Sequence, residues 1–145
     1  MIYCRIKLSK TNYKSYENSL ILDNPNLKEI QKIYKQYCDH KRFKSVMPIF
    51  ENDVKIHKVM GYYHEGEFVA FSLLYELDKH NVEALQFAWN YENPKLRLGI
   101  VSLENECNWA KENGYKYLYL GRGDVYNNPN NYKNQFKGFE VLGAL

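Results

Sequence analysis

The sequence predicts a mixed α/β fold in which an antiparallel meander of three strands precedes a strand–helix–strand unit. Three apolar, strand-like runs lie between residues 59 and 92, joined by the short polar links 64–67 and 78–81. Links this short force neighbouring strands to run antiparallel. The apolar spacing then becomes helical before a further strand-like run, so the last strand is expected to lie parallel to the third.

Two elements are expected before the meander. Residues 2–8 alternate between apolar and polar side chains, which predicts an opening strand. Apolar residues recur at spacings of three and four over residues 27–39, which predicts an amphipathic helix. Asp23 or Asn24 before Pro25 is expected to cap the start of this helix.

The third run of the meander is apolar on both faces, so it is expected in the middle of a sheet with helices over each face. Unbroken alternation would place Glu83, Phe87 and Trp89 on one face. An apolar stripe over residues 96–110 then predicts a helix ending at Gly114, and a buried strand is expected to follow it.

Composition indicates one domain over residues 1–145. The chain is 45% hydrophobic and 26% charged, as in ordinary globular proteins. No apolar run is long enough for a membrane span, and no signal peptide is evident, so a cytoplasmic protein without a membrane partner is expected. Three cysteines without a CxxC pair, and four histidines without ligand spacing, predict no disulfide framework and no metal site.

Charge favours no single class of partner. The formal net charge is +3, although basic residues are dense over residues 28–58. Such a region is either a solvated helix face or a surface that attracts phosphates.

The start of the second helix is a candidate anion site. It directly follows a strand, carries Gly99 in its first turn and has Lys95 and Arg97 beside it. Free backbone N–H groups and the helix dipole favour phosphate at such a position. The alternative is that Gly99 permits close packing while the two cations point into water.

The order of elements and the glycine turn resemble the GCN5-related N-acetyltransferase (GNAT) superfamily. In the turn Leu96-Arg97-Leu98-Gly99-Ile100-Val101, only the central glycine matches that superfamily strictly. A narrower pattern, LG-x-x-SL-x-x-E, A-K-x-x-G-x-K-Y-x-Y-L-G and Y-K-x-x-F-K, resembles the C-terminal domain of arginyl- and leucyl-tRNA–protein transferases. It falls on Leu98, Gly99, Ser102, Leu103, Glu106 (or Glu104), Ala110, Lys111, Gly114, Lys116, Tyr117, Tyr119, Leu120, Gly121, Tyr132, Lys133, Phe136 and Lys137.

The resemblance implies an N-acyltransferase that moves an acyl group, in the first instance acetyl from acetyl-coenzyme A, to an amine of a small molecule or peptide. A protein aminoacyltransferase that uses aminoacyl-tRNA is the second interpretation, and an inactive interaction module is the third. By resemblance, the acyl-coenzyme A would lie between splayed parallel strands and contact Phe87, Ala88, Trp89, Lys95, Arg97, Leu98, Gly99, Ile100 and Val101.

Two catalytic roles have candidates in the sequence. Glu83 is the candidate base, with Glu76, Asp124 and a water chain as alternatives. The superfamily's leaving-group acid is a tyrosine four residues before the glycine of a final Gly-Phe pair, where this chain has Asn134. Tyr132 and Tyr126 are therefore the candidate acids.

Overall fold

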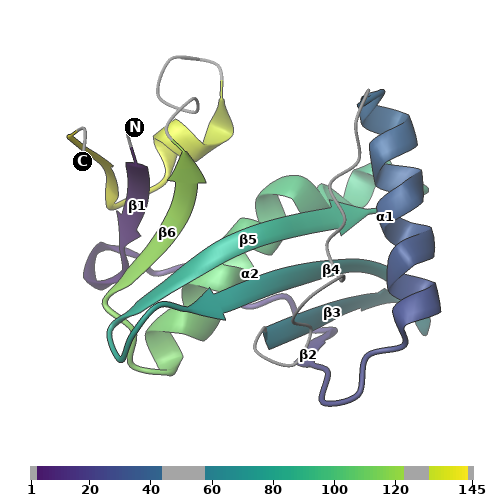
Figure 1. Cartoon of the computed structure of the whole chain (residues 1–145), viewed down its shortest axis with the longest axis horizontal. Helices are drawn as coiled ribbons and strands as arrows, with labels where there is room; N and C mark the ends of the chain where they lie inside the picture. The colour runs from purple at the N-terminus through teal and green to yellow at the C-terminus, as the bar shows by residue number, and fades with distance from the viewer. Residues whose placement is uncertain (1–2, 44–57, 123–130, 144–145) are drawn as a thin grey trace.

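The computed structural model describes residues 3–43, 58–122 and 131–143. These residues form a seven-stranded sheet of order β2-β3-β4-β5-β6-β1-β7 with two α-helices (Figure 1). The strands are β1 (Tyr3–Lys7), β2 (Ser19–Ile21), β3 (Lys58–His64), β4 (Glu67–Glu76), β5 (Asn81–Trp89), β6 (Tyr117–Arg122) and β7 (Phe139–Leu142). The helices are α1 (Leu27–Lys41) and α2 (Leu98–Glu112), with 3-10 turns η1 (Leu8–Lys10), η3 (Pro94–Leu96) and η5 (Tyr132–Gln135).

The predicted fold class is confirmed. Strands β3, β4 and β5 form the antiparallel meander, and β6 returns parallel to β5 after α2. The opening strand β1 lies between β6 and β7, antiparallel to both. The sequence did not predict β2 or β7, which are short strands at the two edges of the sheet.

The predicted cap of α1 is wrong by two or three residues. The side chain of Asn26, rather than Asp23 or Asn24, accepts hydrogen bonds from the backbone N–H groups of Lys28 and Glu29. A side-chain oxygen at this position satisfies donors that have no partner within the first helical turn.

A β-bulge overturns the predicted alternation of β5. Leu74 pairs with Ala84 and Leu73 with Gln86, so Leu85 is an extra residue on β5. An extra residue reverses which face the following side chains occupy. Ala84 and Phe87 therefore both pack on the α2 side of the sheet.

The two helices cover opposite faces of the sheet, as predicted. On one face, α2 buries Leu98, Leu103, Cys107 and Ala110 against the strands. On the other, α1 packs Ile30 and Ile33 against a cluster that includes Phe71, Leu73 and Ala88. The three cysteines are buried and unbridged. Within the described ranges, no helix is long and apolar enough to cross a membrane.

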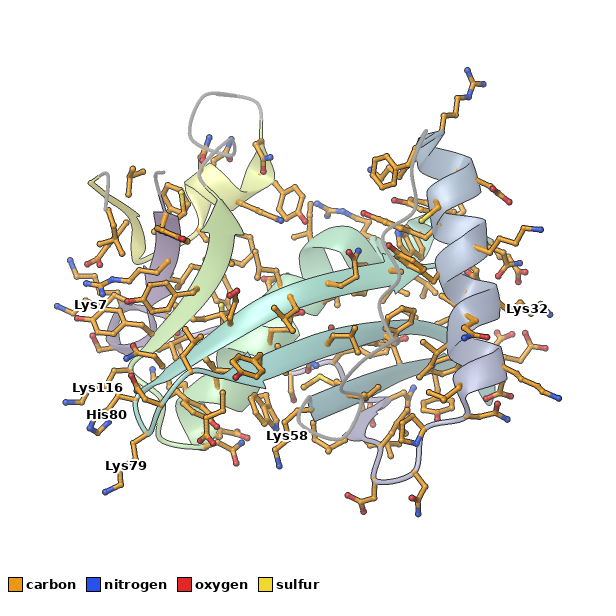
Figure 2. All side chains as sticks on the ribbon, viewed as in Figure 1. Lys7, Lys32, Lys58, Lys79, His80 and Lys116 are labelled. Atoms are coloured by element: carbon orange, nitrogen blue, oxygen red, sulfur yellow. The ribbon has the colours of Figure 1, made fainter. Side chains whose placement is uncertain are left out.

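Basic side chains gather at one end of the sheet. Lys7, Lys79, His80 and Lys116 lie together where β5 and β6 begin (Figure 2). His80 holds this end closed, because its carbonyl accepts hydrogen bonds from the N–H groups of Lys116 (2.7 Å) and Tyr117 (3.2 Å). Any opening between β5 and β6 therefore lies toward their other end.

Candidate active site

Strands β5 and β6 are paired only at their beginnings. The parallel register joins Asn81 to Tyr117, Val82 to Leu118 and Glu83 to Tyr119, whereas β5 continues to Trp89. On its other edge, β5 remains paired with β4 along this length. Beyond Glu83, β5 thus has a free edge facing β6, and the predicted divergence of the two parallel strands is confirmed.

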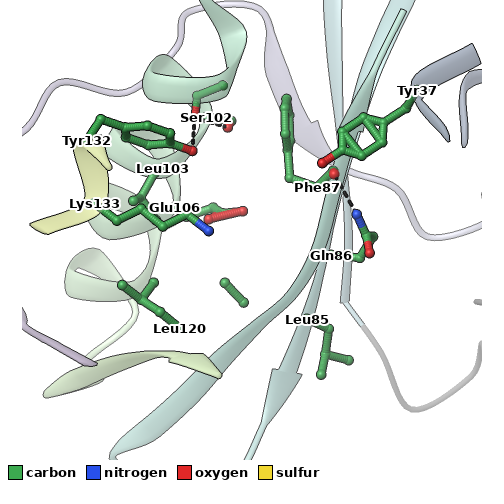
Figure 3. Close-up of a pocket in the computed structure, with 12 residues that line it drawn as sticks. Tyr37, Leu85, Gln86, Phe87, Ser102, Leu103, Glu106, Leu120, Tyr132 and Lys133 are labelled. Carbon is green, nitrogen blue, oxygen red and sulfur yellow. Dashed lines mark hydrogen bonds between the residues drawn. The ribbon is translucent and has the colours of Figure 1, made fainter. Parts of the chain in front are cut away.

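One backbone carbonyl on the free edge of β5 accepts a hydrogen bond from a side chain instead of from a neighbouring strand. The side-chain amide of Gln86 donates a hydrogen bond to the carbonyl oxygen of Phe87 at 2.8 Å, where a neighbouring strand would normally supply the donor (Figure 3). Backbone groups on an edge without a partner strand can bind an extended ligand.

A cavity of about 240 Å³ fills the wedge between the diverging strands (Figure 3). Strand β5, helix α2, strand β6 and the turn η5 all contribute to its wall, and α1 contributes one tyrosine. The lining residues are Tyr37, Ala84, Leu85, Gln86, Phe87, Gly99, Ser102, Leu103, Glu106, Leu120, Tyr132 and Lys133.

Glu106 is a buried carboxyl group in the cavity. Its side chain projects from α2 into the wedge, and the residue is only 3% exposed. Burial raises the pKa of Glu106 from 4.5 to about 7, although a hydrogen bond from Ser72 and the positive charge of Lys133 oppose the shift. A carboxyl group with this pKa is ionised about half the time at neutral pH and can accept a proton there.

A buried polar network holds Glu106 from behind. The hydroxyl of Ser72 lies 2.8 Å from that of Tyr62, and the amide nitrogen of Asn105 donates to the Tyr62 hydroxyl at 3.4 Å. Because Tyr62 can donate to Ser72, the Ser72 hydroxyl remains free to donate to Glu106. The network therefore orients the carboxylate and favours its ionised form.

The turn η5 closes the wedge on the side of β6. The hydroxyl of Tyr132 donates a hydrogen bond to the carbonyl of Gly99 at 3.0 Å, which ties η5 to the first turn of α2. Burial also raises the pKa of Tyr132. The side chain of Lys133 enters the cavity and points toward Glu106 (Figure 3).

An aromatic cluster adjoins the cavity through Tyr37. The Tyr37 ring stacks on Tyr91 with centroids 6.0 Å apart, and His40 stacks on Tyr91 at 3.7 Å. The ammonium group of Lys41 lies 5.8 Å from the centre of the Tyr91 ring. Stacked rings beside a cation are suited to bind a planar, electron-rich group such as a nucleobase.

The predicted catalytic residues are only partly brought together. Glu83 pairs with Tyr75 on the face of the sheet opposite α2, because the bulge at Leu85 separates it from the face of Phe87. Burial raises the pKa of Glu83, but the residue does not line the cavity. Tyr132 lines the cavity, and Tyr126 lies outside the described residues.

Of the residues expected to contact a coenzyme, some line the cavity and others do not. Phe87 and Gly99 line the cavity, whereas Ala88, Trp89 and Leu98 have buried side chains in the two cores. Lys95 and Arg97 are exposed outside the cavity lining, and Val101 lines a separate groove beside Tyr13 and Tyr16.

The first turn of α2 offers fewer free donors than the sequence suggested. The N–H groups of Ile100 and Val101 donate to the carbonyl of Arg97 at 3.1 and 3.0 Å. Leu98 and Gly99 have no acceptor four residues earlier within the helix. An anion at this position would therefore depend on these two N–H groups.

Sequence reasoning missed Glu106 as a functional residue. It named Glu106 only as a position in a family pattern. One signal was nevertheless present, because Glu106 falls on the apolar stripe of α2, three residues after Leu103 and next to Cys107. A carboxylate on the buried face of a helix requires either a partner or a function.

Comparison with known families identifies the chain. The model for the C terminus of arginine-tRNA-protein transferases matches residues 9–143. The chain belongs to this family. No curated protein sequence matches it.

Solved structures of other proteins share the fold of this chain, which is the GNAT-type acyltransferase fold. L-PGS from Bacillus licheniformis has a TM-score of 0.65 at 16% identity, with coverage of 94% of this chain and 53% of that one. A GCN5-related N-acetyltransferase from Kribbella flavida has a TM-score of 0.56 at 11% identity, with coverage of 96% of this chain and 52% of that one. Saccharomyces cerevisiae N-myristoyltransferase with bound myristoyl-CoA has a TM-score of 0.57 at 12% identity, with coverage of 90% of this chain and 39% of that one. The chain thus spans about half the length of these proteins, or less.

Proposed function

We propose that this protein transfers an aminoacyl group from the 3′ end of a tRNA to the amino group of an acceptor, and that the reaction occurs in the wedge between β5 and β6. The observation that carries the proposal is Glu106, a buried carboxylate poised near neutrality inside a cavity bordered by an unpaired strand edge. Membership of the arginine-tRNA-protein transferase family supports the choice of donor.

The chemistry requires a base at this position. The acceptor nitrogen attacks the ester carbonyl carbon, a C–N bond forms, and the C–O bond to the ribose breaks. The attacking amine must lose a proton, which Glu106 accepts, and the leaving oxygen must gain one. Backbone groups on the free edge of β5 would align the ester for attack.

The surroundings of the cavity support an ester carried by a nucleic acid. Tyr37, His40 and Tyr91 provide stacked rings beside the cavity, and Lys41 lies next to them. The terminal base of a tRNA can stack on such rings while its ribose ester reaches into the wedge. Exposed lysines along α1, including Lys28, Lys32 and Lys35, could attract the phosphates.

Acyl-coenzyme A is the second candidate donor. The fold shared with N-myristoyltransferase bound to myristoyl-CoA, and Gly99 in the first turn of α2, support it. Because the N–H groups of Ile100 and Val101 already donate to the carbonyl of Arg97, this turn is a weaker binding site for a pyrophosphate. For this reason we place the tRNA ester first.

A labelled transfer assay distinguishes the two donors. The protein is incubated with total tRNA charged with radiolabelled amino acids, or with labelled acetyl-coenzyme A, together with peptides that carry free amines. Label passing from tRNA to peptide, abolished by Glu106→Gln and retained by Glu104→Gln, is the expected result. Transfer from acetyl-coenzyme A alone would establish the second donor, and no transfer from either would refute both.

Glu104→Gln is a matched control because the two carboxylates lie on the same helix. Glu104 lines the groove near Tyr13 rather than the wedge. Both substitutions remove one carboxylate and retain a similar shape, so a loss of transfer with Glu106→Gln alone, in protein shown to be folded, would point to a role inside the wedge.

A further inference from the structure

We propose that Lys133 is the catalytic acid of this site and that its ammonium group donates the proton that the departing ribose oxygen needs. This inference rests on the proposed function, since it assumes an acyl ester in the wedge. It assigns the second proton transfer of the reaction to a lysine that the sequence pattern marked only as a family position.

The position of Lys133 places a positive charge near Glu106. Lys133 extends from η5 on the β6 side of the wedge, and Glu106 extends from α2 (Figure 3). The positive charge of Lys133 lowers the pKa of Glu106, so the two groups are close enough to interact. Among the described residues, the ion pairs are Arg5–Glu140 and His64–Glu65, so Lys133 and Glu106 do not form a direct ion pair.

The reaction requires that the two groups do not neutralise each other in a direct ion pair. A lysine in direct contact with Glu106 would neutralise the base and close the cavity. Because both side chains line the cavity without a direct ion pair, an ester carbonyl bound there can have its acceptor nitrogen near Glu106 and its leaving oxygen near Lys133. One group can then take a proton while the other supplies one.

The turn η5 is anchored firmly enough to position Lys133. The side chain of Asn131 accepts a hydrogen bond from the Lys133 N–H at 3.0 Å, and Phe136 is 92% buried at the other end of the turn. Tyr132 joins η5 to α2 through its hydrogen bond to the carbonyl of Gly99. The backbone that carries Lys133 is therefore anchored through Asn131, Tyr132 and Phe136.

The same contacts explain why we do not choose Tyr132 for this role. Its hydroxyl proton is already donated to the carbonyl of Gly99 at 3.0 Å. Burial and the charge of Glu106 raise the pKa of Tyr132, so it releases a proton less readily than an ordinary tyrosine. Tyr132 positions η5, and the neighbouring lysine supplies the proton.

The proton balance is complete without any further reactant. Glu106 takes a proton from the attacking nitrogen, and the tetrahedral intermediate forms. When the C–O bond breaks, the ribose oxygen takes a proton from Lys133 Nζ, which becomes a neutral amine. Protonated Glu106 then returns a proton to Lys133 across the cavity, and both groups regain their starting states.

The test compares two leaving groups in wild type, Lys133→Ala and Lys137→Ala. Lys137 is the matched control because its side chain is exposed and lies just beyond η5. One donor is the aminoacyl ester of tRNA, whose alkoxide needs a proton to leave. The other is the pantetheine thioester of the same amino acid, whose thiolate leaves without one.

We expect Lys133→Ala to lower kcat for the ester on the order of 10²–10³-fold, as loss of a general acid does, and for the thioester by less than about tenfold. Added ethylammonium should restore part of the ester reaction, and Lys137→Ala should behave as wild type. Equal losses for both donors, or none, would overturn the assignment of Lys133 while leaving the proposed function intact.

Failure of the proposed function gives a different result. Wild-type protein inactive with both donors, or active only with the thioester, would refute ester transfer and this inference together. A Lys133→Ala variant that fails to fold is recognised by its circular dichroism, and Lys133→Met, which keeps the length of the apolar stem, then replaces it.

Discussion

Glu106→Gln should stabilise the protein in alkaline solution, and the size of the effect follows from the burial of this carboxyl group. Its pKa rises from 4.5 to about 7 on folding. The folded state therefore binds the proton more tightly than the unfolded state. Stability is greatest when Glu106 is protonated, and it falls as the pH rises from about 4.5 through 7.

The magnitude is set by the shift. At about 1.4 kcal/mol per pKa unit, ionised Glu106 costs about 3 kcal/mol at pH 9. Glutamine resembles the protonated acid and does not ionise. The variant should therefore exceed wild type by less than about 1 kcal/mol at pH 5 and by about 3 kcal/mol at pH 9, or roughly 6–12 °C in Tm at pH 9 for a chain of this size.

Thermal unfolding followed by circular dichroism from pH 5 to pH 9 measures this difference. Glu104→Gln serves as the control, because Glu104 lines an open groove near the surface. A difference between Glu106→Gln and wild type that stays constant across this pH range would show that Glu106 is not desolvated. The assignment of the base would then fail.

Three further predictions test the base, its support and the backbone between η5 and β7. Transfer rates at saturating donor should rise about tenfold per pH unit below 7 and level off above it, because Glu106 must be ionised; a pH–rate profile without this limb would exclude the base. Ser72→Ala removes a hydrogen bond that favours ionised Glu106, so the midpoint of that profile should rise by about one pH unit; an unchanged midpoint would exclude the polar network. Gly138→Ala should cost roughly 1–3 kcal/mol in urea unfolding, because φ is +79° and the new methyl group would meet the backbone of Lys7. Gly143→Ala has open space around it and should be nearly neutral; equal effects would contradict this reasoning.

Local patterns were sufficient to predict most of the framework. The short links at 64–67 and 78–81 determined an antiparallel meander, and the change of apolar period before Gly114 determined the helix and the parallel return strand. These inferences succeed because turn length and periodicity act between residues close together in the chain. The short edge strands β2 and β7 lacked such a pattern and were missed.

The tertiary structure decided which side chains share a site. A bulge of one residue at Leu85 places Phe87 on the α2 face of the sheet and leaves Glu83 on the opposite face. No local sequence pattern predicted this bulge. Ser72, Glu106 and Lys133 come from β4, α2 and η5, and only the packing of these elements brings them together.

By itself, then, the sequence determined the order of the main elements and the family to which the chain belongs. The tertiary structure alone decided that Glu106 is buried in the wedge, with its pKa near 7, in the same cavity as Lys133. The reason is physical: periodicity depends on neighbours in the chain, whereas desolvation depends on every segment that excludes water from a group.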